Sequence, residues 1–275
     1  MLYSELQCSE AIHKAVERMG FAEMTEIQEK TIPVMLAGHD VIAKAPTGTG
    51  KTCAFGIPVA EHIQPENKYP QAVIMAPTRE LAQQIAEELS NLTYFMPEVQ
   101  VACVYGGANM EKQAKRLAEG CQIVVATPGR LMDHYKHHSI DISHVTQIVL
   151  DEADEMLNMG FYKDVRHIIE MMKARKALSM FSATISREVM DIGWLYQHNA
   201  EEITEMFFGN WADLMIGDQM GLETYTTLDG TWTDENGVQH NAFEENLTGT
   251  RAMMYDDIGV RHVESFAYVH NIKVI

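Results

Sequence analysis

The sequence predicts an α/β fold in which helices cover both faces of a parallel sheet. From residue 40 to about residue 197, short apolar runs rich in β-branched residues alternate with segments of helical period. This alternation is typical of parallel sheets, because each connection between parallel strands carries a helix back across the sheet. Polar segments directly follow five of the apolar runs, and ligands bind at that end of the strands in such sheets.

Six apolar runs are the candidate strands. They lie at Val41–Ala45, Ala72–Ala76, Val99–Tyr105, Ile123–Ala126, Ile148–Leu150 and Leu178–Phe181. Helical period is clearest in Glu80–Leu92 and Val165–Met172, which lie between these runs. Ser9–Met19 and Glu26–Leu36 predict two further helices ahead of the first strand.

The composition is that of a globular protein with a packed core. The chain has 275 residues, of which 46% are hydrophobic and 22% charged, values that exclude disorder throughout. No apolar run approaches the roughly 20 residues that span a bilayer, and residues 1–5 lack the basic and apolar regions of a signal peptide. We therefore expect a cytoplasmic protein with no membrane partner. The cysteines show no CxxC spacing and are expected to be reduced thiols: Cys8, Cys53, Cys103 and Cys121.

The character of the chain changes after about residue 200. Residues 206–275 are rich in Gly, Thr, Asn, Asp and aromatics, and short alternating runs at Glu223–Thr227 and Gly259–Tyr268 predict a small β-rich extension. The formal net charge is −18, which argues against strong nonspecific nucleic-acid binding by the chain alone. Residues 205–275 hold 12 acidic and 3 basic side chains, and residues 1–204 hold 27 and 18, so the tail is almost three times as acidic per residue. We predict two domains, 1–204 and 205–275.

A glycine-rich loop is the first candidate site. Residues 45–52 read Ala-Pro-Thr-Gly-Thr-Gly-Lys-Thr, follow a predicted strand and open a predicted helix. The glycines let backbone N–H groups turn toward phosphate oxygens, and the helix N-terminus adds its dipole. Lys51 is expected to reach the β and γ phosphates of ATP, and the Thr52 hydroxyl to ligate Mg²⁺. The alternative is an ordinary glycine-rich turn with an unrelated lysine. The candidate nucleotide contacts are Thr47, Gly48, Thr49, Gly50, Lys51 and Thr52.

An acidic segment is the second candidate site. Residues 151–154 read Asp-Glu-Ala-Asp and directly follow the apolar strand 147–150. Asp151 is expected to hold Mg²⁺, and Glu152 to orient and deprotonate an attacking water. Taken alone, the segment also fits an acidic helix N-terminus that the helix dipole favours. The phosphate-type loop a hundred residues upstream favours the hydrolytic interpretation.

These motifs resemble those of the first of the two RecA-like domains of a DEAD-box ATP-dependent RNA helicase. The resemblance covers residues 2–204 and implies a RecA-like parallel sheet. Gly20-Phe21 and residues 25–28, Thr-Glu-Ile-Gln, resemble the adenine-reading Q motif. In that role the amide of Gln28 pairs with the adenine edge, as Gln does when it reads adenine in DNA, and Phe21 stacks near the base. Tyr3 stands at the upstream aromatic position, where the family usually has Phe.

Three further segments resemble those that grip the RNA sugar–phosphate backbone in this family. They are residues 77–82 (Pro-Thr-Arg-Glu-Leu-Ala), Gly106-Gly107 and residues 127–130 (Thr-Pro-Gly-Arg). Taken alone, the last also fits a turn that caps the next helix, and the glycine pair fits a plain turn. The resemblance implies weak binding of single- or double-stranded RNA with little sequence preference. The implied contacts are Pro77, Thr78, Arg79, Gly107, Thr127, Pro128, Gly129 and Arg130.

Residues 182–184, Ser-Ala-Thr, resemble the motif that couples hydrolysis to domain closure through hydrogen bonds to the Asp-Glu-Ala-Asp segment. Ser182 and Thr184 therefore join Lys51, Asp151 and Glu152 as expected catalytic residues. The family's second RecA-like domain carries a His-Arg-x-Gly-Arg-x-Gly-Arg segment, which does not occur in this sequence. An arginine finger contributes about 10³–10⁵ in rate. We therefore expect nucleotide binding with weak hydrolysis and no autonomous unwinding, unless a partner supplies the second domain.

The tail resembles the C-terminal segment of a tailed-bacteriophage major capsid protein, over residues 206–269. Phe207–Gly217, Asp256–His262 and Glu264–Ala267 carry the resemblance. It implies that the chain joins two unrelated proteins near residue 205. The alternative is an unrelated acidic β-rich extension.

Three functions are open on the sequence. The chain is an ATP-binding helicase domain with weak ATPase activity, a non-enzymatic RNA- or protein-binding module of the same fold, or an assembly protein acting through its tail. The presence of Lys51, Thr52, Asp151 and Glu152 together favours the first, because a pure binding module has no need of all four. The missing body of a shell protein argues against the third.

Overall fold

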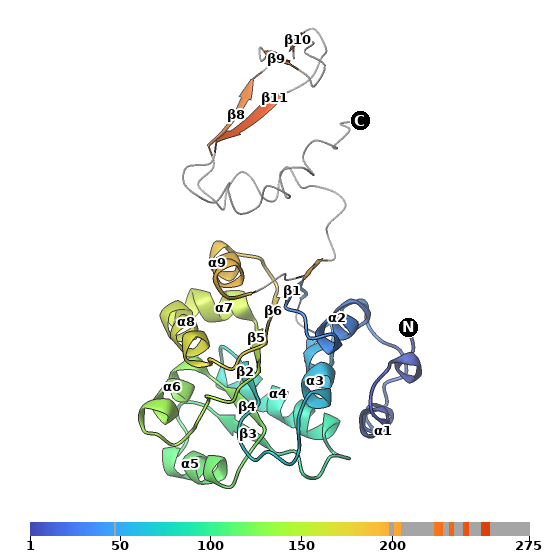
Figure 1. The fold of residues 1–275 in the computed structure, drawn as a ribbon, viewed down its shortest axis with the longest axis vertical. Helices are drawn as coiled ribbons and strands as arrows, with labels where there is room; N and C mark the ends of the chain where they lie inside the picture. Colours follow the sequence, from blue (N-terminus) through green and yellow to red (C-terminus); the bar gives the residue numbers. More distant parts are fainter. Residues whose placement is uncertain are drawn as a thin grey trace. The chain divides into compact units, whose positions relative to one another are not determined.

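The computed structural model describes residues 1–46 and 48–197, and beyond these the strands 201–204, 223–227, 231–233, 239–241 and 249–253 (Figure 1). The chain divides into two compact units, Met1–Glu205 and Met206–Ile275.

A seven-stranded sheet forms the centre of the first unit, with the order β3-β4-β2-β5-β6-β1-β7. All neighbouring strands in it run parallel. The strands are β1 (Val41–Lys44), β2 (Ala72–Met75), β3 (Val101–Val104), β4 (Ile123–Ala126), β5 (Gln147–Asp151), β6 (Ala177–Ser182) and β7 (Glu201–Thr204). The parallel α/β sheet predicted from the sequence is confirmed.

Helices connect these strands and lie on both sides of the sheet (Figure 1). They are η1 (Tyr3–Glu5), α1 (Glu10–Arg18), α2 (Glu26–Leu36), α3 (Lys51–Glu61), α4 (Arg79–Leu92), α5 (Met110–Ala118), α6 (Pro128–Lys136), α7 (Ala153–Met156), the π-helical η2 (Leu157–Phe161), α8 (Tyr162–Met171) and α9 (Arg187–Tyr196). The helix predicted at 26–36 has the predicted bounds, and those predicted at 9–19, 80–92 and 165–172 differ by one to three residues at their ends.

Two strand predictions need correction. The run Val99–Tyr105 is a strand only over Val101–Val104, because the chain turns into and out of the sheet at its ends. The strand Glu201–Thr204 was not predicted at all. Its sequence, Glu-Glu-Ile-Thr, contains a single apolar residue, and an edge strand needs no continuous apolar run, since one of its sides has no neighbouring strand to pack beside.

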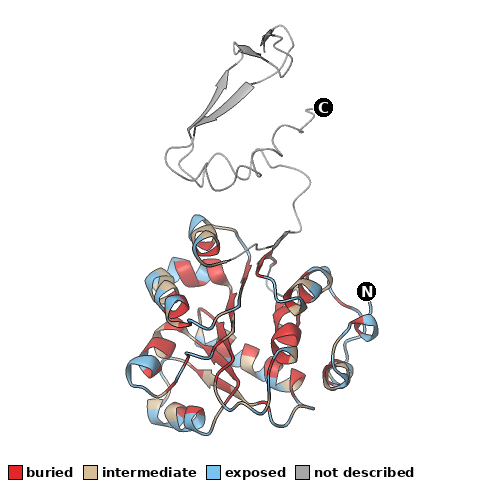
Figure 2. Cartoon of the chain, in the orientation of Figure 1, coloured by how far each residue is buried: buried red, intermediate tan, exposed pale blue. Residues whose placement is uncertain are grey.

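The core consists of two apolar layers, one on each face of the sheet. Val41 and Ala43 of β1 belong to the layer that α1–α4 cover. Ile42, between them, belongs to the layer that α5–α9 cover. This alternation follows from the period of two along a strand. Figure 2 shows buried residues along strands β1–β6 and exposed residues on the outward sides of the surrounding helices.

Helix α3 is the most deeply enclosed helix of the layer that contains it. Nine of its eleven residues are buried. Its Phe55 packs edge-to-face against Phe181 of β6, with ring centroids 5.3 Å apart. Close approach of α4 is possible because residue 56 is glycine: a Cβ there would lie 2.8 Å from Leu92 Cδ1. The helix that starts at Lys51 is thus fixed against both the sheet and its neighbour.

The second unit contains antiparallel strand pairs. Strand β8 (Glu223–Thr227) pairs with β11 (Gly249–Met253), and β9 (Thr231–Thr233) pairs with β10 (Gln239–Asn241). The alternating run predicted at Glu223–Thr227 is therefore a strand. The run predicted at Gly259–Tyr268 lies outside the described residues.

Among the residues that the structure describes, no helix is both long and apolar enough to cross a bilayer. The four cysteines are free thiols. Burial raises the pKa of Cys53 to about 12 and that of Cys121 to about 11, so both thiols are protonated at neutral pH.

The Phe55–Phe181 contact predicts a large stability effect. Replacing Phe181, which is fully buried, by alanine should lower the free energy of unfolding by about 3–5 kcal/mol, because it removes the ring and leaves a cavity. Chemical denaturation followed by the helical circular-dichroism signal measures this. Phe95→Ala is the control, since this ring is 41% exposed and its loss should change the stability little. Equal effects for the two variants would contradict the assignment of Phe181 to the core.

Candidate functional site

The sheet order divides the carboxyl edge into two halves. Strands β5, β6 and β1 are neighbours. Asp151 is the last residue of β5, Ser182 the last residue of β6, and the glycine-rich segment 45–50 follows β1. Strands β3, β4 and β2 are also neighbours, and the segments after them are those predicted to contact RNA. The register aligns the strand ends, since Lys44 lies opposite Ser182 and Met75 opposite Ala126. Two groups of motifs that are scattered along the sequence are therefore brought together as two adjacent sites.

The segment 45–50, which we call the glycine loop, joins β1 to α3. Gly48 and Gly50 both have left-handed backbone conformations, with φ of 86° and 89°, which glycine adopts without the penalty of a Cβ atom. The Thr49 hydroxyl donates to Pro46 O at 2.9 Å, closing the loop on itself. No acidic residue lies in the first turn of α3, so its positive end faces the loop uncompensated. Thr47 lies outside the described residues.

Lys51 and Asp151 meet in an ion pair beneath this loop. The Lys51 Nζ lies 3.4 Å from Asp151 Oδ1, and both side chains are buried, with 6% and 3% of their surface exposed. Burial raises the pKa of the Asp151 carboxyl, and the charge of Lys51 opposes that shift. Within the described part of the chain, the ammonium group makes no hydrogen bond. The first predicted motif thus contacts the second, although a hundred residues separate them.

Gln28 holds the glycine loop from the opposite side. Its Oε1 accepts hydrogen bonds from Tyr3 Oη at 2.7 Å and from Thr25 N at 2.9 Å. Its Nε2 donates to Gly50 O at 2.9 Å. The fit is tight, because a Cβ at Gly50 would lie 2.4 Å from that nitrogen. These structural bonds of the amide were not predicted from the sequence, although Thr25 and Gln28 have the spacing of a capping box.

Phe21 lies beside this anchor at the surface. Its ring is 45% exposed and stacks on Tyr3, with centroids 6.4 Å apart and planes inclined by 24°. Burial raises the pKa of the Tyr3 hydroxyl, which keeps it protonated as a donor to Gln28. The exposed ring of Phe21 is thus held by the buried ring of Tyr3, which is bonded to Gln28.

The Ser-Ala-Thr segment is hydrogen-bonded to Asp154. Both the backbone N–H and the hydroxyl of Thr184 donate to Asp154 Oδ2, at 2.8 and 2.7 Å. The Asp154 N–H donates to Ser182 Oγ at 3.1 Å, and that hydroxyl donates to Thr184 O at 2.7 Å. Burial alone would raise the pKa of Asp154, but these bonds outweigh it and the pKa is lowered. The hydrogen bonds expected between this segment and residues 151–154 are therefore present, and they are made by Asp154, which was not among the predicted site residues.

Glu152 has an unusual backbone conformation. Its φ of 49° lies in the left-handed region, where a residue with a side chain is strained by about 1 kcal/mol or more. Its N–H donates to Asp151 Oδ1 at 3.0 Å. As the N-cap of α7, it stands at the turn between β5 and that helix. The turn places consecutive carboxylates in different environments, Asp151 buried and Glu152 half-buried.

In the other half, Arg79 and the loop after β3 are in contact. Thr78 caps α4 by accepting from Leu81 N at 3.3 Å, which leaves Arg79 exposed at the helix start. The Arg79 guanidinium lies over the ring of Tyr105, 5.1 Å from its centroid. Gly107 has φ of 81°, and a Cβ there would lie 4.0 Å from Arg79 Nη1. The structure thus brings Arg79 and Gly107 together.

Residues 127–130 begin helix α6 in the same half. The Thr127 N–H donates to Val104 O at 3.1 Å, and Pro128 occupies the first helical turn. Arg130 is largely buried, with 12% of its side chain exposed. Its Nη1 donates to Ala108 O at 3.0 Å and to Gln113 Oε1 at 3.2 Å. Pro77 and Pro128 are buried as well, so these two side chains support the surface and do not form it.

A family model named DEAD/DEAH box helicase matches residues 25–192. The chain belongs to this family. It is 47% identical over 203 residues to ATP-dependent RNA helicase CshA of Limosilactobacillus reuteri, covering 74% of this chain and 41% of that protein. It is 48% identical over 201 residues to CshA of Listeria monocytogenes serovar 1/2a, covering 73% and 38%. The chain thus spans about two fifths of the length of these relatives, and contains a DEAD-box helicase domain homologous to that part of CshA.

Solved structures agree with the fold. A DEAD box protein from the hyperthermophile Methanococcus jannaschii matches with a TM-score of 0.69 and 39% identity, covering 74% of this chain and 56% of that one. A hypothetical ATP-dependent RNA helicase from Sulfolobus tokodaii matches with a TM-score of 0.66 and 40% identity, covering 71% and 57%. The resemblance predicted for residues 2–204 is confirmed at the level of the family. The capsid-type resemblance of residues 206–269 remains a prediction, and most of that segment lies outside the described residues.

The Asp154–Thr184 contact predicts a pH-dependent stability. A carboxyl whose pKa is lowered by folding adds stability above its unfolded pKa of about 4, and this is lost as the pH falls through the folded value. Thr184→Val should therefore cost about 1.5 kcal/mol of unfolding free energy near neutral pH, and the cost should shrink below about pH 4. Denaturant titrations across this range measure both.

Thr93→Val is the matched control for this experiment. The Thr93 hydroxyl donates at 2.9 Å to the neutral carbonyl of Leu89, so the cost of removing it should not depend on pH. If the loss of unfolding free energy in Thr184→Val is also independent of pH, then the hydroxyl does not stabilise the ionised carboxylate of Asp154.

Proposed function

We propose that this chain binds ATP with Mg²⁺ at the glycine loop, as the nucleotide-binding half of a DEAD-box RNA helicase. The observation that carries the proposal is the buried ion pair between Lys51 and Asp151, 3.4 Å apart, directly under a loop with two left-handed glycines. A buried lysine beside backbone N–H groups and a helix N-terminus is suited to a polyphosphate.

The residues present fit a magnesium nucleotide. The Lys51 ammonium is buried and, within the described residues, has an ion-pair partner but no hydrogen-bond acceptor, which suits a group that awaits a phosphate oxygen. Asp151 and Thr52 would supply the oxygen ligands that Mg²⁺ prefers. The bound ion would neutralise charge on the β and γ phosphates. Thr47, Thr49 and the loop backbone would surround the phosphates, with Gln28 and the exposed ring of Phe21 at the adenine.

Glu152 would orient and deprotonate the attacking water, since it directly follows the Mg²⁺ ligand Asp151 in the turn after β5. Ser182 and Thr184 are tied to the next acidic residue, Asp154, by hydrogen bonds of 2.7–3.1 Å. A shift of the Asp-Glu-Ala-Asp segment on loss of the γ phosphate would therefore be transmitted through Asp154 to the segment after β6. We propose that efficient hydrolysis also needs a cationic group from outside residues 1–204, supplied by a second RecA-like domain, and that turnover by this chain alone is weak.

The segments after β2, β3 and β4 would bind the RNA backbone. Arg79 is exposed and held over Tyr105, which suits a phosphate contact. Gly107 and Gly129 would offer backbone groups at the same edge, and Thr127, whose backbone N–H and C=O are already bonded within the fold, would offer its hydroxyl. Arg130, being mostly buried, would act by ordering the loop of Ala108 rather than by reaching far into solvent. Contacts of these kinds carry little base specificity.

A non-enzymatic binding module is the alternative for the first unit, and the complete set of Lys51, Thr52, Asp151 and Glu152 argues against it. For the second unit we propose an origin in a different protein class, of capsid type. Its antiparallel strand pairs and its high density of acidic residues support this. Sedimentation of the intact chain tests an assembly role, because large closed particles would favour it and a monomer would exclude it.

The first test is nucleotide binding and turnover, with and without single-stranded RNA. Titration with a fluorescent ATP analogue should show Mg²⁺-dependent binding that Lys51→Ala weakens about ten- to a hundredfold, because a charge-assisted contact to phosphate is lost. Glu152→Gln should bind as the unmodified protein does. Turnover should be low in all three proteins.

Two outcomes would contradict these proposals separately. RNA-stimulated turnover that disappears in Lys51→Ala would show that the chain completes its own hydrolytic site. Failure of the unmodified chain to bind the nucleotide would instead overturn the ATP-binding proposal itself.

A further inference from the structure

Behind the predicted RNA-binding edge lies a buried polar cluster whose two central side chains, Gln113 and His134, belong to no predicted motif. Its centre is Gln113 of α5, which is 8% exposed. The Gln113 Nε2 donates to Tyr105 O at 3.1 Å. Its Oε1 receives Arg130 Nη1 at 3.2 Å and lies 3.0 Å from His134 Nε2. A single amide therefore joins helix α5, the loop after β3 and helix α6.

The geometry fixes the orientation of this amide and the tautomer of His134. A carbonyl oxygen accepts only, so the donor to Tyr105 O must be Nε2, and Oε1 must face Arg130 and His134. His134 Nε2 then carries the proton. The other ring nitrogen, Nδ1, is then left as an acceptor for the Ser139 hydroxyl, 2.8 Å away, which it shares with His134 O at 3.1 Å. The cluster is thus a chain of hydrogen bonds that links Ser139, His134 and Gln113.

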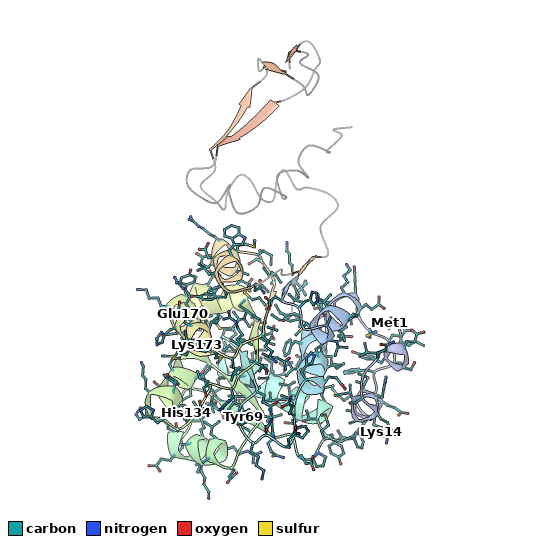
Figure 3. All side chains as sticks on the ribbon, viewed as in Figure 1. Met1, Lys14, Tyr69, His134, Glu170 and Lys173 are labelled. Carbon is teal, nitrogen blue, oxygen red and sulfur yellow. The ribbon has the colours of Figure 1, made fainter. Side chains whose placement is uncertain are left out.

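His134 is fully buried within α6, whose position Figure 3 marks by the labelled side chain. Burial, followed by the nearby charge of Arg130, lowers the pKa of the imidazole, in agreement with a neutral ring that donates through one nitrogen and accepts through the other. A buried neutral polar side chain with both nitrogens hydrogen-bonded is costly to replace by an apolar one, since its partners are left unpaired.

The cluster holds the loop after β3 and the start of α6, which are two of the segments predicted to contact RNA. The glycine pair at 106–107 lies between two bonded carbonyls. Gln113 donates to Tyr105 O on one side of the pair, and Arg130 donates to Ala108 O on the other. Tyr105 also carries the Arg79 guanidinium on its ring, and the Gln83 amide donates to its hydroxyl at 2.8 Å. Moving the Gln113 amide would therefore displace Gly107, Arg79 and Arg130 together.

We propose that Gln113 and His134 are positioning residues for RNA: they set the spacing between the loop after β3 and the start of α6, and hold Arg130 in place, without touching RNA themselves. This inference rests on the RNA binding proposed above for the same edge. The cluster lies in the half of the sheet away from the glycine loop. RNA affinity should therefore depend on Gln113 and His134, and nucleotide affinity should not.

The test uses the intact chain and four variants. Gln113→Met and His134→Phe remove the hydrogen bonds at similar volume, and His134→Gln keeps an amide donor within reach of Gln113. The matched control is Gln122→Met. Gln122 is also buried, at 1% exposure. Its side chain makes three hydrogen bonds, donating to Pro65 O and Glu98 O and accepting from Gln100 N, but it precedes β4 at the opposite edge of the sheet.

Three quantities are measured for each protein: affinity for a fluorescein-labelled single-stranded polyuridine RNA at low salt, affinity for a fluorescent ATP analogue, and hydrogen exchange over residues 105–109. We expect Gln113→Met and His134→Phe to weaken RNA binding about tenfold, to speed exchange in that loop, and to leave nucleotide affinity unchanged. His134→Gln should recover most of the RNA affinity. Gln122→Met, which also removes the hydrogen bonds of a buried amide, should leave RNA affinity and the exchange of residues 105–109 unchanged.

RNA affinity that is unchanged in Gln113→Met, or that falls equally in Gln122→Met, would overturn the positioning role while leaving the proposed RNA binding in place. If the unmodified chain binds nucleotide but not the RNA, then both the RNA part of the proposed function and this inference are wrong. Weakened nucleotide binding in the cluster variants would also contradict the separation of the two halves.

Discussion

The in-register parallel pairing of β5, β6 and β1 is the constraint on which the rest of the site depends. Because Lys44 lies opposite Ser182, and Asp151 opposite Phe181, the loops after these strands emerge side by side. Lys51 can then reach Asp151 across the loop, and Asp154 can receive Thr184. A slip of one residue in any of these pairs would turn every strand side chain to the other face of the sheet and separate the charged groups.

The strand order also explains why the predicted nucleotide and RNA sites lie at different parts of the carboxyl edge. Strand β2, next to β5, starts the second half of the sheet, so the two groups of motifs adjoin without overlapping. Each half has its own buried polar anchor. In one it is Gln28, which binds Gly50 O, and in the other it is Gln113, which binds Tyr105 O. Both anchors are amides, which can donate and accept at once and therefore join segments whose backbone groups would otherwise be unpaired.

The features that the sequence predicted are those that depend on residues close together in the chain. The strands and the positions of Lys51 and Asp151 could be predicted, because apolar runs and glycine spacing are local signals. The strand at 201–204 could not, since Glu-Glu-Ile-Thr has no apolar pattern and pairs with β1 only through the tertiary fold. Gln113, His134 and the burial of Arg130 were missed because their partners lie 8 to 22 residues away on other elements, and no periodicity encodes such contacts.

Helix α3 has a consequence for motion at this site. It is buried at nine of its eleven positions, and Phe55 and Gly56 fit closely against β6 and α4, so the helix cannot tilt or slide without opening the core. Its first turn, with Lys51, is therefore a stiff boundary. A rearrangement that follows binding at the glycine loop would therefore occur outside α3, in the neighbouring segments that carry Glu152 and Thr184.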